Sequence, residues 1–68
     1  MMRLQVNGLA AEVAAATVAE LLAAQGIDPA ARFLAVAVNG AVVRRAEWAL
    51  RRLADGDDVE IVRPLSGG

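Results

Sequence analysis

Few side chains in this sequence could carry out chemistry of their own. Thr17 and Ser66 supply its only hydroxyl groups, and the sequence contains no cysteine, histidine, lysine or tyrosine. Those missing types provide most general bases and activated nucleophiles in enzymes. Cysteine and histidine are also the usual zinc ligands. The side chains therefore predict that the chain is not an enzyme by itself.

The carboxylate side chains also favour a structural explanation. Asp55, Asp57 and Asp58 surround Gly56, in a segment that is typical of a tight turn. Aspartate in a turn commonly accepts hydrogen bonds from its own backbone. We therefore expect a turn here rather than an acid–base pair, and no resident metal ion or bound cofactor.

The remaining reactive group is the main-chain carboxylate of Gly68. It follows Leu65, Ser66 and Gly67, and Pro64 is expected to end the last strand because it cannot donate to a sheet. Four extended residues reach about 13–14 Å, which is enough to enter a narrow cleft of another protein. Glycine permits close backbone approach, so this carboxylate could meet a nucleotide phosphate. A frayed terminus has a similar composition, and the two glycines alone do not distinguish these interpretations.

Five strands are expected from alternating or continuous apolar residues and from the turn signals between them. Two Asn-Gly pairs suit tight hairpin turns, because both residue types accept positive φ angles. The central run of apolar residues suggests a strand covered on part of both faces. The expected strands are 3–7, 10–14, 33–39, 41–43 and 58–63.

One main helix is expected over Thr17–Gln25. The Thr17 hydroxyl can cap its first turn, and Glu20 can reach back to the cap. A second, short helix or turn is expected over 45–53, where Trp48 is interpreted as covering a small core. The chain thus predicts an α+β fold with one main helix against one mixed sheet, although the pattern leaves the strand order open.

Composition limits the partners that this chain is expected to have. Seven arginines and eight acidic residues give a net charge of −1, which provides no basic surface for nucleic acid or an anionic membrane. Glu12 and Glu20 interrupt the alanine-rich stretch, so no membrane span is predicted. No secretory signal is evident, and a cytoplasmic location is expected.

Short groups of residues follow one another in an order that is specific when they are taken together. They are Thr17-Val18-Ala19-Glu20-Leu21-Leu22, Ala37-Val38-Asn39-Gly40 with Val42-Val43, Glu47-Trp48, Asp55-Gly56-Asp57 with Val59-Glu60-Ile61-Val62, and Gly67-Gly68. Each group alone is common. In this order, over essentially the whole chain, they resemble the sulfur carriers of thiamine biosynthesis, the ThiS family.

This resemblance implies a β-grasp fold over residues 1–64, as in ubiquitin, and a flexible tail over 65–68. It implies that an E1-like adenylating enzyme uses ATP and magnesium to convert the Gly68 carboxylate into an acyl-adenylate. A persulfide donor would then supply the sulfur of a thiocarboxylate, and thiazole synthase would consume it. Leu65, Ser66 and Gly67 would thread the partner's active site. The residues from Arg63 to Ser66 depart from relatives, which often carry Val, Ala or Gly there.

Val62, Arg63 and Phe33 are candidates for partner docking. An exposed apolar patch on the sheet, away from the helix, would mark a docking surface, although the apolar residues could equally complete the core. Two alternatives to the thiamine pathway remain open. One is the small subunit of molybdopterin synthase (MoaD), against which Glu47-Trp48 and the short length weigh. The other is a β-grasp binding module with an inert terminus.

Overall fold

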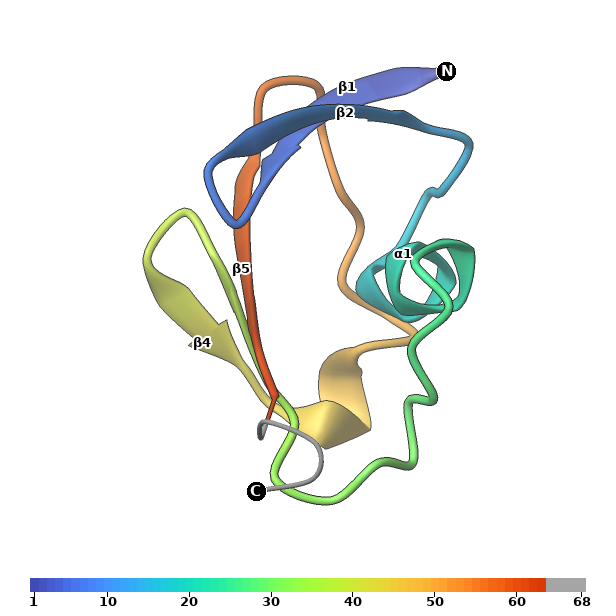
Figure 1. Cartoon of the computed structure of the whole chain (residues 1–68), viewed down its shortest axis with the longest axis vertical. Coiled ribbons are helices and arrows are strands. Elements are labelled where there is room, and N and C mark those ends of the chain that lie inside the picture. Colours follow the sequence, from blue (N-terminus) through green and yellow to red (C-terminus); the bar gives the residue numbers. More distant parts are fainter. Residues whose placement is uncertain (64–68) are drawn as a thin grey trace.

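A five-stranded mixed sheet carries one helix against one of its faces (Figure 1). This computed structural model describes residues 1–63 of the chain. The sheet order is β2-β1-β5-β3-β4, with β1 parallel to β5 and every other pair antiparallel. The predicted α+β, β-grasp arrangement is confirmed. Its elements are β1 (Met2–Val6), β2 (Leu9–Val13), α1 (Val18–Ala24), β3 (Ala35–Val38), β4 (Ala41–Val43), the 3₁₀ helix η1 (Arg45–Glu47) and β5 (Asp58–Val62).

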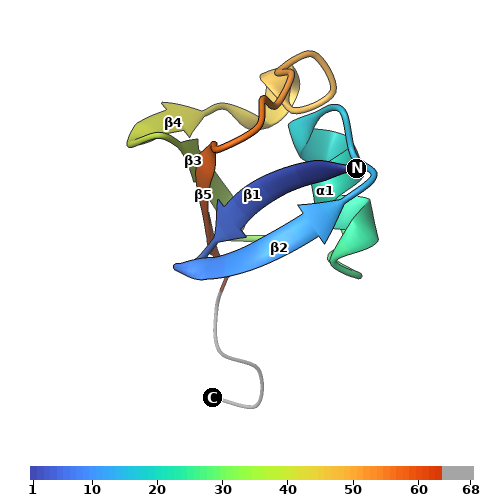
Figure 2. The ribbon, with the colours of Figure 1, turned by 90° about the horizontal axis from the view of Figure 1, so that it is seen from above.

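Two hairpins with two-residue turns form the outer parts of the sheet. Asn7 and Gly8 have φ angles of 51° and 83°, and Asn39 and Gly40 have angles of 52° and 84°. Positive φ at both central residues defines a type I′ turn, whose twist matches that of paired strands. Both predicted hairpins are confirmed, with β2 beginning one residue earlier than expected. Figure 2 shows the resulting twist, with the β1–β2 hairpin curving past α1.

The asparagines of these turns also bind the central strand β5. The Asn39 amide donates from Nδ2 to Asp57 Oδ1 (2.9 Å), and its Oδ1 accepts from the Asp58 N–H (2.9 Å). On the other side, Asn7 Oδ1 accepts from the Ile61 N–H (2.7 Å). Each hairpin is therefore tied to β5 by a side chain as well as by its strand, which helps to hold the register.

The helix begins as the sequence predicts. Thr17 Oγ1 accepts from the Glu20 N–H (3.2 Å), so the cap at Thr17 is confirmed. The Glu20 carboxylate, however, accepts from the Ala16 N–H (2.7 Å), one residue before the expected donor. The expected helix over 17–25 corresponds to α1 together with its two capping residues. Within residues 1–63, no helix is long and apolar enough to cross a membrane.

The core lies between α1 and one face of the sheet. Trp48 is buried at 3% exposure, and its indole N–H donates to the Val43 carbonyl (2.8 Å). Trp48 therefore belongs to the core, as predicted, and η1 occupies part of the segment for which a short helix or turn was expected. The most deeply buried side chains are Leu4, Val18, Leu21, Leu22, Val36, Val38 and Val59.

The predicted third strand differs from the observed one. The sequence predicts residues 33–39, whereas β3 covers Ala35–Val38. Phe33 has a φ angle of 63°, which is left-handed backbone and cannot continue a strand. The strand lies inside the sheet, between β5 and β4, but among residues 1–63 no second layer covers its outer face, and Ala35 is exposed. Ala37 on this face is half-buried, however, so the expected cover on part of both faces holds at Ala37 and fails at Ala35.

Candidate functional site at the carboxyl end of the sheet

The predicted sulfur-carrying residue Gly68 lies outside the described residues, as do Leu65, Ser66 and Gly67. The structure places the strand that precedes this segment in the sequence. That strand is β5, which is the central strand of the sheet. In Figure 1 the end of β5 lies at the opposite end of the molecule from the N-terminus.

The end of β5 is held on both sides by hydrogen bonds. Antiparallel pairing with β3 continues to the last residue of the strand, where Val62 lies opposite Ala35. Parallel pairing with β1 stops at Val6 and Val59, and the Asn7 side chain then takes the Ile61 N–H. A segment that follows β5 therefore starts from a position that the fold defines closely.

An exposed apolar surface lies beside this position, on the face of the sheet away from α1. We call it the outer patch, and it consists of the exposed residues Ala35, Val42 and Val62 together with the half-buried Ala37. Val62 is 63% exposed and Val42 is 78% exposed. Together with Val36 and Glu60, these residues line a shallow hollow of about 160 Å³.

The structure shows which apolar residues of the segment 33–38 complete the core and which lie on an exposed patch. Val36 and Val38 point into the core, whereas Ala35 and Ala37 alternate with them on the outer face. Val62 joins the outer face because it pairs with Ala35. The sequence analysis did not identify Val42 as part of this surface. Only its pairing with Ala37 brings it there.

The three predicted docking residues come together at this end of the sheet. Phe33 is 79% exposed and lies two residues before Ala35. Arg63 follows Val62 directly and is also exposed. Phe33 lies just before β3 and Arg63 just after β5, and the pair Ala35–Val62 joins these two strand ends. That they dock a partner stays a prediction.

The acidic turn before β5 has the structural role that its sequence suggests. Asp57 Oδ2 accepts from the Ala54 N–H (2.8 Å), within the turn itself. The hydrogen bond from Asn39 is the main reason that the pKa of Asp57 is lowered. The Ala54 N–H and the nearby Arg51 charge add to this shift, and burial opposes it. In the described part of the chain, no group of three or more acidic residues is arranged to hold a metal ion.

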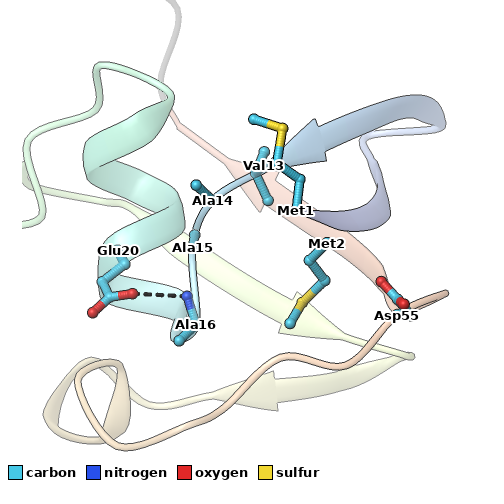
Figure 3. Close-up of a pocket in the computed structure, with 8 residues that line it drawn as sticks. All are labelled: Met1, Met2, Val13, Ala14, Ala15, Ala16, Glu20 and Asp55. Carbon is cyan, nitrogen blue, oxygen red and sulfur yellow. Dashed lines mark hydrogen bonds between the residues drawn. The ribbon is translucent and has the colours of Figure 1, made fainter.

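A larger hollow, of about 450 Å³, lies away from the end of β5. Figure 3 shows it between the start of β1, the end of β2 and the beginning of α1. Glu20 is one of its lining residues, and the Glu20 carboxylate accepts a hydrogen bond from the Ala16 N–H. Its other lining residues are mainly alanine and methionine, and Met1 is an exposed terminal residue. This hollow offers no arrangement of groups that suggests a reaction.

Comparison with known proteins identifies the family. The sequence model of the ThiS family matches residues 4–68. A crystal structure of the thiamine biosynthesis protein (ThiS) from Geobacter metallireducens has a TM-score of 0.78 and 36% identity, covering 98% of this chain and 100% of that chain. A solution NMR structure of a thiamine biosynthesis protein from the same organism has the same score and identity, and covers 98% and 88%. No curated protein matches this sequence. Because the family model spans nearly the whole chain, including both terminal glycines, this chain belongs to the ThiS family.

Proposed function

We propose that this protein carries sulfur for thiazole formation in thiamine biosynthesis, and that the Gly68 carboxylate is the carrying group. The main support is the family match, which extends through Gly67 and Gly68. The side-chain inventory supports the same proposal, because it lacks the usual nucleophiles and bases. The reactive step then depends on partner enzymes that act on the main chain.

The proposed chemistry has two stages. In the first, a Gly68 carboxylate oxygen forms a bond to the α-phosphorus of ATP, and pyrophosphate leaves with magnesium. In the second, the terminal sulfur of a persulfide attacks the carbonyl carbon and AMP leaves. A thiol then cleaves the sulfur–sulfur bond, which leaves a thiocarboxylate at Gly68 and a disulfide on the donor side. Thiazole synthase takes the sulfur from this thiocarboxylate.

The surface around the end of β5 suits this role. An E1-like adenylating enzyme must hold the Gly68 carboxylate in its active site while it contacts the folded body. Leu65, Ser66 and Gly67 would occupy the channel between the two. The outer patch lies at the root of this segment, and exposed apolar surface of this kind is typical of protein–protein contacts. Val62 and Arg63 are the docking residues proposed nearest to the channel.

Intact-mass measurement tests the proposal directly. The protein is incubated with the adenylating enzyme from the same genome, magnesium, ATP and a persulfide donor. We expect the mass to increase by the difference between one sulfur atom and one oxygen atom. A variant lacking Gly68 should fold normally and keep its original mass. If the enzymes modify a control carrier and leave this chain unchanged, a β-grasp binding module with an inert terminus explains it better.

A second measurement separates the thiamine pathway from the molybdopterin alternative. The thiocarboxylated protein is offered separately to thiazole synthase and to the large subunit of molybdopterin synthase. We expect sulfur transfer with thiazole synthase alone. Transfer only with the molybdopterin synthase subunit would keep the carrier chemistry and overturn the assignment to thiamine.

A further inference from the structure

Phe33 combines two features that are unusual for a large aromatic residue. Its side chain is 79% exposed, whereas the other aromatic residue of the chain, Trp48, is buried. Its backbone is left-handed, with φ at 63°. That conformation is unfavourable for a residue with a bulky side chain, and glycine or asparagine adopts it more readily. Backbone strain of this kind is often associated with a functional site.

The folded body explains the backbone of Phe33 but not its ring. The left-handed residue redirects the chain so that Leu34 enters the core and β3 can begin at Ala35. A glycine would make the same turn at a lower conformational cost. The Arg32 guanidinium lies 5.8 Å from the centre of the ring. An exposed cation–π pair at this distance is weak. The ring therefore adds little to the stability of the fold.

The segment that carries Phe33 is held in place by Arg45. The Arg45 guanidinium donates to the carbonyl oxygens of Pro29 and Ala31. The same guanidinium stacks over the buried Trp48 ring, 4.7 Å from its centre. The loop before β3 is thus fixed to η1, and the ring at Phe33 is presented from an ordered support. An ordered support lowers the entropy lost when a partner binds.

The position of Phe33 favours one partner. Phe33 lies two residues before Ala35, and Ala35 pairs with Val62 at the end of β5. In Figure 1 the loop between α1 and β3 lies at the same end of the molecule as the end of β5. Five residues follow Arg63, and an extended segment of that length reaches about 17–18 Å. An enzyme that holds Gly68 within this reach works at the end of the molecule where the loop that carries Phe33 lies.

We propose that Phe33 is the aromatic anchor of the contact with the adenylating enzyme, and that its ring enters an apolar pocket on that enzyme. This inference rests on the proposed carrier function. Aromatic side chains that fill a partner's pocket commonly dominate the binding energy of an interface. The outer patch, which begins at Ala35 two residues after Phe33, then excludes water from the rest of the contact.

The substitution Phe33→Gly separates anchoring from folding. It removes the ring and also relieves the left-handed backbone, so the thermal midpoint should stay equal or rise. ATP–pyrophosphate exchange by the adenylating enzyme measures the first step without a sulfur donor. We expect KM for the carrier to rise about 10- to 100-fold, which is the range of an interface hot spot, with kcat nearly unchanged. Phe33→Asn is the second variant, because asparagine also accepts this backbone.

Two further variants complete the experiment. Phe33→Trp retains an aromatic anchor and should keep KM well below that of Phe33→Gly. Leu50→Ala removes another highly exposed apolar side chain, from the segment after η1, and should leave KM within about twofold of the wild type.

The possible outcomes are distinct. A KM within about twofold of the wild type for both Phe33→Gly and Phe33→Asn would overturn the anchor. An equal loss in Leu50→Ala would overturn it too, because the effect would not be specific to Phe33. A wild-type chain that never supports exchange would overturn the carrier function itself, and this inference with it.

Discussion

The two faces of the sheet are built from the same strands but differ in burial. On the inner face, Leu4, Val36 and Val59 are almost completely buried against α1. On the outer face, Val42 and Val62 remain exposed although they are equally apolar. Alternation along a strand sends neighbouring residues to opposite faces. A valine therefore packs into the core at one position and stays exposed at the next.

The largest effect that can test this contrast is the loss of an inner-face side chain. We expect Leu4→Ala to lower the free energy of unfolding by about 2–5 kcal/mol, because it leaves a cavity in a small core. Urea denaturation measures this. Val62→Ala on the outer face should change it by less than about 0.5 kcal/mol. Similar losses in the two variants would show that the faces are not divided as described.

The second test concerns the register that assigns residues to faces. A shift of one residue would exchange the buried and exposed sets. We expect Asn39→Ala to lower the free energy of unfolding by about 2 kcal/mol, because it removes the bonds to Asp57 and Asp58 and disfavours the positive φ angle. Asn39→Gly keeps the backbone favourable and should cost about 1 kcal/mol. If Asn39→Gly is as damaging as Asn39→Ala, the backbone contribution is absent.

The third test moves to the outer face itself. Val62→Glu places a charge in the outer patch next to Glu60. Partner binding should weaken about tenfold, which corresponds to about 1.4 kcal/mol, because a charge must be desolvated at an apolar contact. The KM for the carrier in pyrophosphate exchange measures the effect. Ala23 is exposed on α1, on the other side of the sheet, so Ala23→Glu adds the same charge away from the outer patch and should leave KM unchanged. An unaffected Val62→Glu would place the contact elsewhere.

The smallest effect is electrostatic and concerns Asp57, which supports the Asn39 turn. The pKa of Asp57 is lowered in the fold, mainly by the Asn39 hydrogen bond. A lowered pKa means that the ionised form stabilises the fold at a pH above the unfolded value of 3.8. This contribution is lost as the pH falls through the folded pKa. Urea midpoints measured from about pH 6 down to about pH 3 should fall less steeply for Asp57→Asn than for the wild type. Parallel curves would contradict the assignment to Asp57.

Local signals in the sequence predicted most elements of the fold. The two Asn-Gly pairs identified both hairpins, and Thr17 identified the start of α1. The third strand was placed too early, because its apolar composition does not show that Phe33 takes a left-handed backbone. Its outer face was expected to be covered in part, because an apolar run is also typical of a buried strand.

The candidate site was only partly predictable. Phe33, Val62 and Arg63 were named as docking residues, but nothing in the sequence shows that the strand after Phe33 pairs with the strand that contains Val62. The contribution of Val42 was missed for the same reason, since it depends on pairing with Ala37. The roles of Asn7 and Asn39 in holding β5 were missed too. Their side chains bond to residues 54 and 18 or 19 positions away, and such contacts leave no local pattern.

The amino-acid sequence alone determined the turns, the helix cap and the alternation of strand residues. Each depends on interactions between residues that are close in the chain. The tertiary structure decided the order of the strands and the composition of the surface beside the end of β5. Placing β5 between β1 and β3 requires pairing between residues about fifty positions apart, Gln5 with Asp58 and Val6 with Val59. Long-range pairing of this kind is selected by the packing of the whole core, which no single segment specifies.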